Sequence, residues 1–232
     1  MRTDSEFGQR IDALLIAENN RFLAEVLSAP HLTDETPLNE RYYLRHRIET
    51  IKRIRMTAHT DALALAAMVH EDYDAARLWA RYICVELDHD RMFYDDLAHH
   101  GVSRHQVDVT PELPATRALD EYLRRRIARD GAIAAVAYSV FVEWNSARFS
   151  RRAIEKARAA FGDSHIGGSV SHLEVDEDED HYETMVDVAG RLTSDPGREQ
   201  AFRDDLSEIA KLFRHYFHDL HQDSIGHGEM AA

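Results

Sequence analysis

Apolar residues recur at helical spacing along almost the whole chain, whereas the strict alternation typical of a half-buried strand is never sustained. In the first such segment, Ile11, Leu15, Phe22 and Val26 mark one face of a helix that Pro30 ends. The same spacing, interrupted by prolines, glycines and polar loops, predicts further helices over residues 38–68, 74–99, 115–129, 132–146, 170–192 and 198–221. A cap-like Thr60–Asp61 pair predicts a joint within the helix over 38–68.

Nothing in the chain separates two domains. The sequence has no internal repeat and no shift of composition. Its 232 residues are enough to bury a substantial core in one unit without disulfide bonds. The pattern therefore predicts a single all-α domain of about seven helices over residues 1–225, followed by a flexible tail over 226–232.

Charge and composition argue against several partners and locations. Lys and Arg total 28 against 42 Asp and Glu, a formal net charge of −14. Nucleic acid and anionic membranes both require clustered positive charge, so we expect neither as a partner. The longest apolar run, residues 132–142, is too short to span a membrane, and the N-terminus has no apolar signal segment. A single cysteine, Cys84, suits a reducing compartment, and we expect a cytoplasmic protein.

The 15 histidines are the unusual count, and one of them, His89, follows Glu86 at helical spacing. On a continuous helix these two side chains share a face, so a carboxylate and an imidazole can converge on one point. Glu-x-x-His supplies ligands to di-iron sites in helical bundles, because carboxylate oxygen and imidazole nitrogen suit iron and manganese. Taken alone, the pair is also typical of a solvated helix face.

Glu143 stands near the end of the most apolar segment of the chain, residues 132–144. A helix that is apolar on nearly all sides is buried, and an ionised carboxylate within it needs a charged partner or a metal ion. Arg148 and Arg151 are candidate partners. The metal becomes the better hypothesis because two other segments also offer ligands.

The third segment, residues 172–181, combines two histidines with a dense acidic run. Six of the seven residues from Glu174 to Asp180 are acidic, and a bound cation would explain why so many carboxylates are tolerated together. Helical spacing divides the candidates into two sets on opposite faces, one with Glu174, Asp178 and His181, the other with His172, Asp176 and Glu179. A straight helix cannot aim both sets at one site, whereas a π-bulge or local unwinding could.

In these motifs the sequence resembles the heme-oxygenase-like di-iron oxidases and oxygenases, a superfamily that also includes thiaminase-like and pyrroloquinoline-quinone-synthase-like helical proteins. The resemblance covers residues 79–192, about half of the chain. It rests on Glu86 and His89 followed by Phe93, Asp96, Leu97 and Gly101, on Pro114-x-x-x-Ala118, on Gly131 followed by Glu143, and on a late motif similar to the family's His-x-x-x-Asp-x-x-His. It implies a single-domain bundle of about seven helices that holds metals between its core helices.

The late motif departs from the family pattern. His172 and Asp176 begin it, but Glu179 stands in place of the final histidine; read from the other end, Asp178 and His181 close it, but Glu174 replaces the first histidine. Either two residues are inserted, or one iron has a carboxylate in place of an imidazole, which would leave the second metal labile. By resemblance the ligands are Glu86, His89, Glu143, Asp178 and His181, with His172, Glu174 and Asp176 competing for the remaining place.

The resemblance also implies an activity. It points to a non-haem di-iron oxidoreductase that binds two Fe(II) ions, with manganese as the alternative, and takes O2 as co-substrate. We expect it to N-oxygenate, desaturate or oxidatively cleave a small amino-acid- or amine-type metabolite in natural-product biosynthesis. On the second predicted helix, Arg45 and Tyr42 are candidate substrate-binding residues, since an arginine there could hold a carboxylate through two hydrogen bonds. An external reductant and a homodimer are both compatible with the sequence.

Two other classes of function fit the sequence. One is a cofactor-independent, thiaminase-like hydrolase with Cys84 as nucleophile, although a thiol between Ile83 and Val85 is more often an inert core residue. The other is a metal-free interaction module, in which the acidic run from Glu174 to Asp180 docks a basic partner. Binding of Fe(II) separates the first hypothesis from both alternatives.

Overall fold

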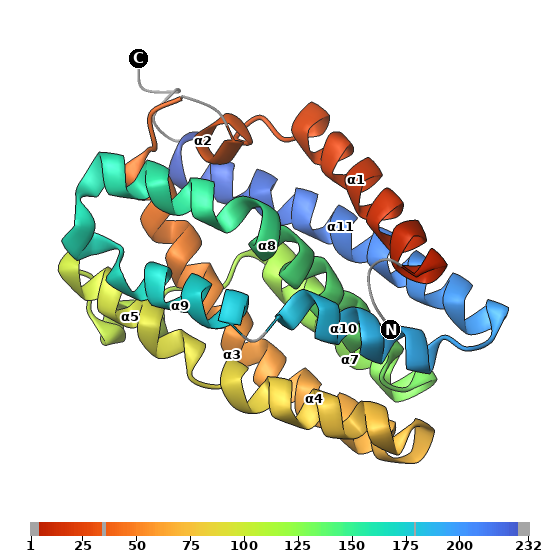
Figure 1. Ribbon diagram of the computed structural model, residues 1–232. Coiled ribbons are helices and arrows are strands. Elements are labelled where there is room, and N and C mark those ends of the chain that lie inside the picture. Colours follow the sequence, from red (N-terminus) through yellow and green to blue (C-terminus); the bar gives the residue numbers. More distant parts are fainter. Residues whose placement is uncertain (1–4, 34–35, 179, 227–232) are drawn as a thin grey trace.

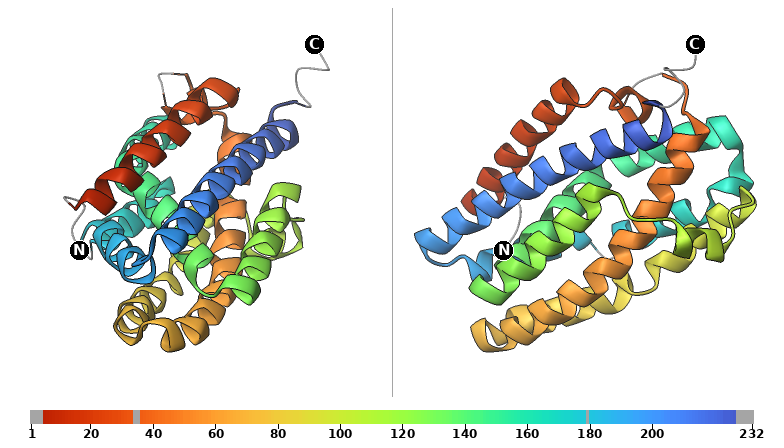
Figure 2. Two further views of the ribbon diagram at one scale, coloured as in Figure 1. Left: turned by 90° about the vertical axis from the view of Figure 1, so that its right-hand side faces the viewer. Right: turned by 180° about the vertical axis from the view of Figure 1, so that it is seen from behind.

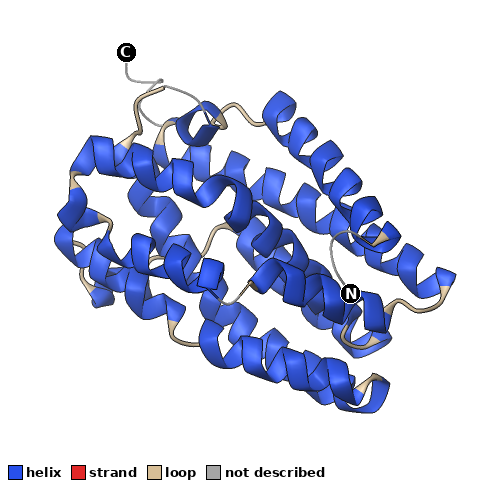
Figure 3. Ribbon diagram, in the orientation of Figure 1, coloured by secondary structure: helices blue, strands red, loops and turns tan. Residues whose placement is uncertain are grey.

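The computed structural model describes residues 5–33, 36–178 and 180–226, and within these ranges the chain is helical and forms no strand (Figure 3). The helices, labelled in Figure 1, are α1 (Glu6–Glu25), α2 (Pro30–Thr33), α3 (Glu40–Glu71), α4 (Tyr73–Glu86), α5 (His89–His99), α6 (Arg104–Val109), α7 (Pro114–Asp130), α8 (Ile133–Phe161), α9 (Gly167–Asp178), α10 (His181–Leu192) and α11 (Pro196–Ser224). A short 3-10 turn, Asp163–His165, precedes α9. The predicted all-α fold is confirmed, with more helices in the described residues than expected.

The first half of α8 is the centre of the bundle. Every residue from Ala132 to Val140 is buried, as the apolar pattern predicts. Helices α7, α10 and α11 pack against α8, and α3 closes the far side, where it lies next to α7 and α11 (Figure 2). The largest buried side chains of this core include Trp79, Met185 and Phe202. Burial of each such side chain contributes on the order of 2 kcal/mol, so this shared core accounts for the packing of the bundle.

Helix α3 is continuous, and the predicted joint at Thr60–Asp61 is wrong. The Thr60 hydroxyl donates a hydrogen bond back to the carbonyl of Thr57 instead of capping a new helix. Both Thr60 and Asp61 are buried in the middle of the helix. A threonine can make this backward bond within a helix, which removes the reason to expect a cap.

The helix predicted over 74–99 is instead two helices, α4 and α5, which follow one another along one edge of the molecule (Figure 1). Leu87 and Asp88 separate them in a tight turn, where the N–H of Asp88 donates to the carbonyl of Val85. A bond of this shorter reach is typical of a helix end. Glu86 therefore ends one helix and His89 begins the next, so the prediction that they share one helix is wrong.

The helix predicted over 170–192 is also interrupted. Asp180 adopts a left-handed conformation with φ 51° and ψ 49°, and α10 begins at the next residue, His181. This is the local unwinding that the two opposed sets of candidate ligands required. Figure 1 shows α9 and α10 meeting at this break in front of the bundle.

Two further expectations concern the ends and the surroundings of the chain. Nearly all of the predicted tail, 226–232, lies outside the described residues. Among the described helices, none combines the length and the apolar character that crossing a bilayer requires.

Candidate metal centre

Three separate helices bring Glu86, Glu143 and His181 together at the centre of the bundle. Each offers one ligand atom, and these atoms all lie within 4.8 Å of one another. Nδ1 of His181 is 3.5 Å from Oε1 of Glu86 and 3.8 Å from Oε2 of Glu143. Glu143 and His181 are buried and Glu86 is partly buried, so the cluster is screened from bulk water.

A tyrosine hydroxyl helps to orient Glu143. The hydroxyl of Tyr82 donates a hydrogen bond of 2.8 Å to Oε1 of Glu143. Arg148, one of the two predicted partners, instead pairs with Asp12 at 2.5 Å, and Arg151 is exposed. As a neutral donor, the hydroxyl orients the carboxylate without adding a charge of its own.

Two more imidazoles border the cluster. Nδ1 of His89 lies 3.1 Å from Oε2 of Glu86, so the tight turn between α4 and α5 preserves the contact that a continuous helix would have made. The rings of His89 and His172 have centroids 4.3 Å apart, and those of His89 and His181 are 6.4 Å apart. The break at Asp180 thus allows histidines from both ends of the interrupted segment to approach the same site.

The start of α9 is fastened to α5 by a buried acid that the sequence did not single out for this role. The carboxylate of Asp96 accepts hydrogen bonds from the backbone N–H groups of Gly168 and Ser169 and from the Ser169 hydroxyl. An acid at the first turn of a helix satisfies its free N–H groups and complements its dipole. Gly168 also allows close approach, since a Cβ there would lie 1.8 Å from the carbonyl oxygen of Met92.

Carboxylates dominate the electrostatics of the candidate centre. Burial raises the pKa of Tyr82 well above its usual value, and the charges of Glu143, Glu86 and Asp61 raise it further. The pKa of Asp61 is likewise raised, first by burial and then by the charge of Glu86. Asp61 was expected only as a helix joint; its position on a buried face of α3 makes it a further candidate carboxylate that spacing did not reveal.

The remaining predicted ligands are placed less fully. Glu174 is exposed, so the structure brings His172 rather than Glu174 to the centre. The side chains of Asp176 and Asp178 lie outside what the structure describes, as does Glu179, and their ligand roles stay predictions. The acidic docking face proposed for this run stays a prediction for the same reason.

A cavity of about 320 Å³ leads away from the metal centre along α3. Its inner end is lined by Asp61, Tyr82, Glu86, Glu143 and His172. Its other walls come mainly from α1, α3, α8 and α11, and they combine aromatic side chains, Phe22, Phe141, Phe213 and Phe217 among them, with polar ones that include Arg47 and Arg53. A cleft with apolar walls and a few polar groups is the usual form of a small-molecule site.

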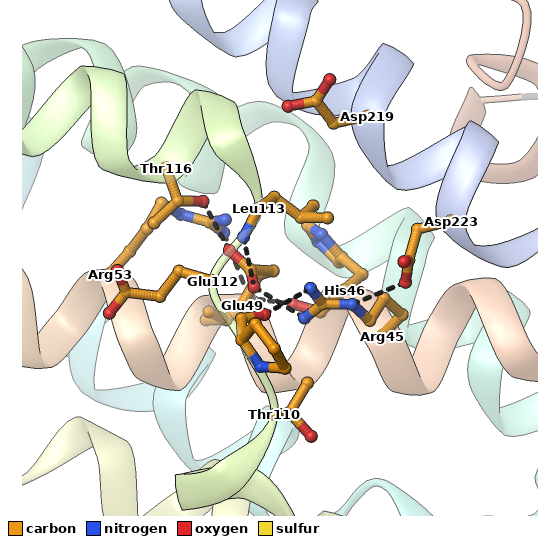
Figure 4. Close-up of polar contacts among 12 residues, drawn as sticks. Arg45, His46, Glu49, Arg53, Thr110, Glu112, Leu113, Thr116, Asp219 and Asp223 are labelled. Atoms are coloured by element: carbon orange, nitrogen blue, oxygen red, sulfur yellow. Dashed lines mark hydrogen bonds and ion pairs between the residues drawn. The ribbon is translucent and has the colours of Figure 1, made fainter.

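Two predicted substrate-binding residues, Arg45 and Tyr42, do not line this cavity. The guanidinium of Arg45 donates to Glu49 at 2.6 Å and to Asp223 at 2.8 Å, on the other side of α3 (Figure 4). The Tyr42 hydroxyl donates to Ser28. These contacts occupy both side chains in packing α3 against its neighbours, so the structure gives no support to a substrate role for either.

Cys84 is exposed and is not among the residues that line the cavity. A thiol in this position does not face a ligand bound near the centre. The donor set of the centre consists of carboxylate oxygens and imidazole nitrogens held by separate helices, which fits iron or manganese better than calcium or a thiolate-bound metal.

Comparison with known proteins identifies the fold. No protein-family model and no curated protein matches the sequence. Among solved structures, a domain of unknown function with a heme oxygenase-like fold from Shewanella denitrificans has a TM-score of 0.80 at 15% identity, with 95% of this chain and 94% of that chain covered. A TenA homologue from Pseudomonas syringae pv. tomato has a TM-score of 0.76 at 16% identity, covering 96% and 98% of the two chains. A TenA homologue from Pyrococcus furiosus has a TM-score of 0.68 at 13% identity, covering 92% and 99%. The chain therefore has the heme oxygenase-like fold, as its resemblance to that superfamily implied.

Proposed function

We propose that this protein is a non-haem, metal-dependent oxidoreductase that holds two iron ions and uses O2 to oxidise a small amino-acid- or amine-type metabolite. The observation that carries the proposal is the convergence of Glu86, Glu143 and His181 within 4.8 Å at a buried point beside His89. Bound Fe(II) would supply Lewis acidity and electrons for the reduction of O2, with an external reductant restoring it.

The protein's own residues have distinct tasks in this proposal. Glu86 faces His89 through Oε2 and His181 through Oε1, so these three residues would help to hold the metal. Glu143 would add a second negative charge that offsets the charge of the metal, and Tyr82 donates the hydrogen bond that orients its carboxylate. The aromatic side chains of the cavity would help to exclude water from the substrate, and its acidic end would offer the substrate a polar contact.

A hydrolase of the thiaminase type is the second candidate. Two of the similar structures are described as TenA homologues, and the buried Tyr82–Glu143 pair is an arrangement that could serve acid–base chemistry without a metal. Cys84 would not be the nucleophile of such an enzyme, because it is exposed and does not line the cavity.

Anaerobic titration of the metal-free protein with Fe(II) tests the first candidate. We expect tight binding of about two equivalents, as in other carboxylate-rich bundles. Glu143→Gln should weaken binding strongly while far-UV circular dichroism stays unchanged. Glu155→Gln, an exposed position on the same helix, is the matched control and should bind like the wild type.

The outcome also separates the two candidates. Failure of the wild-type protein to bind Fe(II) would overturn the oxidoreductase. Cleavage of thiamin by chelator-treated protein, abolished by Glu143→Gln, would establish the hydrolase in its place. Metal-dependent O2 consumption that is lost in Glu143→Gln supports the oxidoreductase.

A further inference from the structure

The cavity changes character along α3, from the acidic metal centre to a stretch with two arginines. Arg47 and Arg53 line it from the same helix that contributes Asp61. With a rise of about 1.5 Å per residue, Arg53 and Asp61 are roughly 12 Å apart along the helix axis. Tyr138, which also lines the cavity, lies near both regions. Burial raises the pKa of Tyr138, Arg53 lowers it, and Asp61 raises it. A small ligand could therefore contact both regions at once.

Arg53 has donor capacity that the protein does not use. Its residue surface is 8% exposed, and Nη2 donates to the Thr50 hydroxyl at 3.2 Å. The guanidinium lies 4.4 Å from the ring centroid of Tyr216 and 5.6 Å from that of Phe213. Nη1 is buried and has no hydrogen-bond acceptor. The aromatic rings and the Tyr216 side chain stabilise the cation, but they do not satisfy Nη1.

Arg47 repeats the arrangement one and a half turns earlier in α3. Its guanidinium lies 5.0 Å from the ring centroids of both Tyr43 and Phe93, and its Nε is buried without an acceptor. Within the described part of the chain, neither Arg47 nor Arg53 forms an ion pair.

Other poorly exposed arginines of this protein are neutralised by acids. Arg45 pairs with Glu49, and Arg126 pairs with Asp205. Among the arginines that the structure describes, Arg47 and Arg53 thus differ from Arg45 and Arg126 in facing a cavity with a buried donor that has no acceptor. Because a buried donor without an acceptor costs free energy, such a pair is expected where a ligand supplies the acceptor.

We propose that Arg47 and Arg53 bind the carboxylate of the substrate, whose reactive group extends toward Glu86 and Glu143. This assignment rests on the proposed function and narrows its substrate class to carboxylic acids. The planar guanidinium matches a carboxylate because both present paired polar atoms in one plane. The spacing along α3 favours a substrate in which several bonds separate the carboxylate from the position that is oxidised.

Calorimetric binding of two matched probes tests the site: 4-phenylbutyrate and its neutral isostere 4-phenylbutyramide. We use the full chain, first metal-free, so that the probe carboxylate cannot bind a metal, and then loaded with Fe(II) without O2. We expect the metal-free protein to prefer the acid by about tenfold, the magnitude typical of a hydrogen bond to a charged group. Arg47→Gln and Arg53→Gln should each remove most of this preference.

Arg55→Gln is the matched control, since Arg55 lies on the same helix but is paired with Asp90 and Asp108 outside the cavity. It should keep the wild-type preference. If Arg53→Gln does not fold, Arg53→Lys retains the charge and Arg47→Gln alone still decides the assignment. Equal binding of the two probes to the wild type, or a preference that survives Arg47→Gln, would overturn it.

Two further outcomes are informative. Displacement of 4-phenylbutyrate by inorganic phosphate more readily than by acetate would overturn the carboxylate assignment in favour of a phosphate site. The Fe(II) titration is independent of the probe measurement. If the wild type binds no iron but still prefers the acid, the oxidoreductase proposal fails and the anion site stands; if it binds iron but shows no preference, the reverse holds.

Discussion

Asp96 accepts two hydrogen bonds from Ser169, one from its backbone N–H at 2.9 Å and one from its hydroxyl at 2.5 Å. A third, from the N–H of Gly168, measures 2.7 Å. Because α5 begins with His89 and α9 carries His172, this contact fixes the two helices whose imidazoles border the metal centre. Asp96 thus positions residues of the candidate metal site without belonging to it.

Replacement of Asp96 should therefore affect both stability and metal binding. Asp96→Ala leaves buried N–H groups without an acceptor, and we expect the free energy of unfolding to fall by about 2 kcal/mol. The affinity for Fe(II) should fall as well, because α9 is no longer held against α5. Urea denaturation and Fe(II) titration measure the two effects. Asp95→Ala, an exposed neighbour, is the control; equal behaviour of the two variants would contradict the prediction.

Neighbouring glycines at the start of α9 should respond very differently to alanine. In Gly168→Ala the new Cβ would lie 1.8 Å from the carbonyl oxygen of Met92, so α5 and α9 must separate. We expect a loss of about 2 kcal/mol or more in unfolding free energy. Gly167→Ala meets nothing within 4 Å and should be nearly neutral. Thermal unfolding of both variants makes the comparison, and similar melting temperatures would show that α9 does not pack this closely.

Tyr82 offers a test of how Glu143 is held. Tyr82→Phe removes the hydrogen bond to Glu143 but retains the ring, which packs against Trp79 and His181. Loss of such an orienting partner lowers metal affinity about tenfold or more in other sites, and we expect a similar reduction in Fe(II) affinity here. Tyr122→Phe, which removes a comparable bond to Asp205 outside the centre, should leave iron affinity unchanged. Unaltered affinity in Tyr82→Phe would show that Glu143 does not need this bond.

His46 predicts a loss of stability in mild acid. Burial, with the charges of Arg53 and Arg47, lowers the pKa of His46 well below 6.5. Below pH 6.5 His46 therefore binds a proton in the unfolded chain but not in the folded protein, so acidification favours unfolding. Between pH 6.5 and 5 this contributes up to about 2 kcal/mol.

His46→Gln, which cannot titrate, should flatten this pH dependence, whereas the exposed His59→Gln should not. Urea denaturation at a series of pH values measures the slope in each protein. Parallel slopes in the wild type and His46→Gln would assign the acid sensitivity to other groups.

Much of the fold follows from the sequence because its helices have clear apolar faces and clear stops. Residues 115–129 were predicted as a helix, and α7 runs from Pro114 to Asp130. Helix α8 extends beyond the predicted 146 to Phe161, because the run after Ser146 has few large apolar residues but favours helix through Ala, Arg, Glu and Lys. It ends where Gly162 adopts φ 86°. The breaks at Leu87–Asp88 and at Asp180 contain no proline or glycine, so no local signal announces them.

The candidate site, like the fold, could be predicted only in part. Glu86, His89, Glu143, His172 and His181 stand out locally as acids and imidazoles within apolar or ligand-like segments. The sequence does not show which arginine of α3 faces the cavity. Arg45 and Arg47 look equivalent in sequence, but they point roughly 200° apart around the helix. Only the packing of α3 against its neighbours decides that Arg47 reaches the cavity and Arg45 reaches Asp223. Asp61 was missed for the same reason.

The left-handed conformation of Asp180 also affects how the spacing between ligands can vary in evolution. A kink of this kind resets the rotational phase of the chain, so residues after it no longer have to keep step with those before it. Two residues inserted between ligands would turn the later ligand of a continuous helix away from the site, whereas a break in the helix accommodates them. Homologues that share such a centre can thus differ in the number of residues between their ligands. A sequence motif of fixed spacing would not detect them. The inheritance of this site is better traced through the meeting of Glu86, Glu143 and His181 in space.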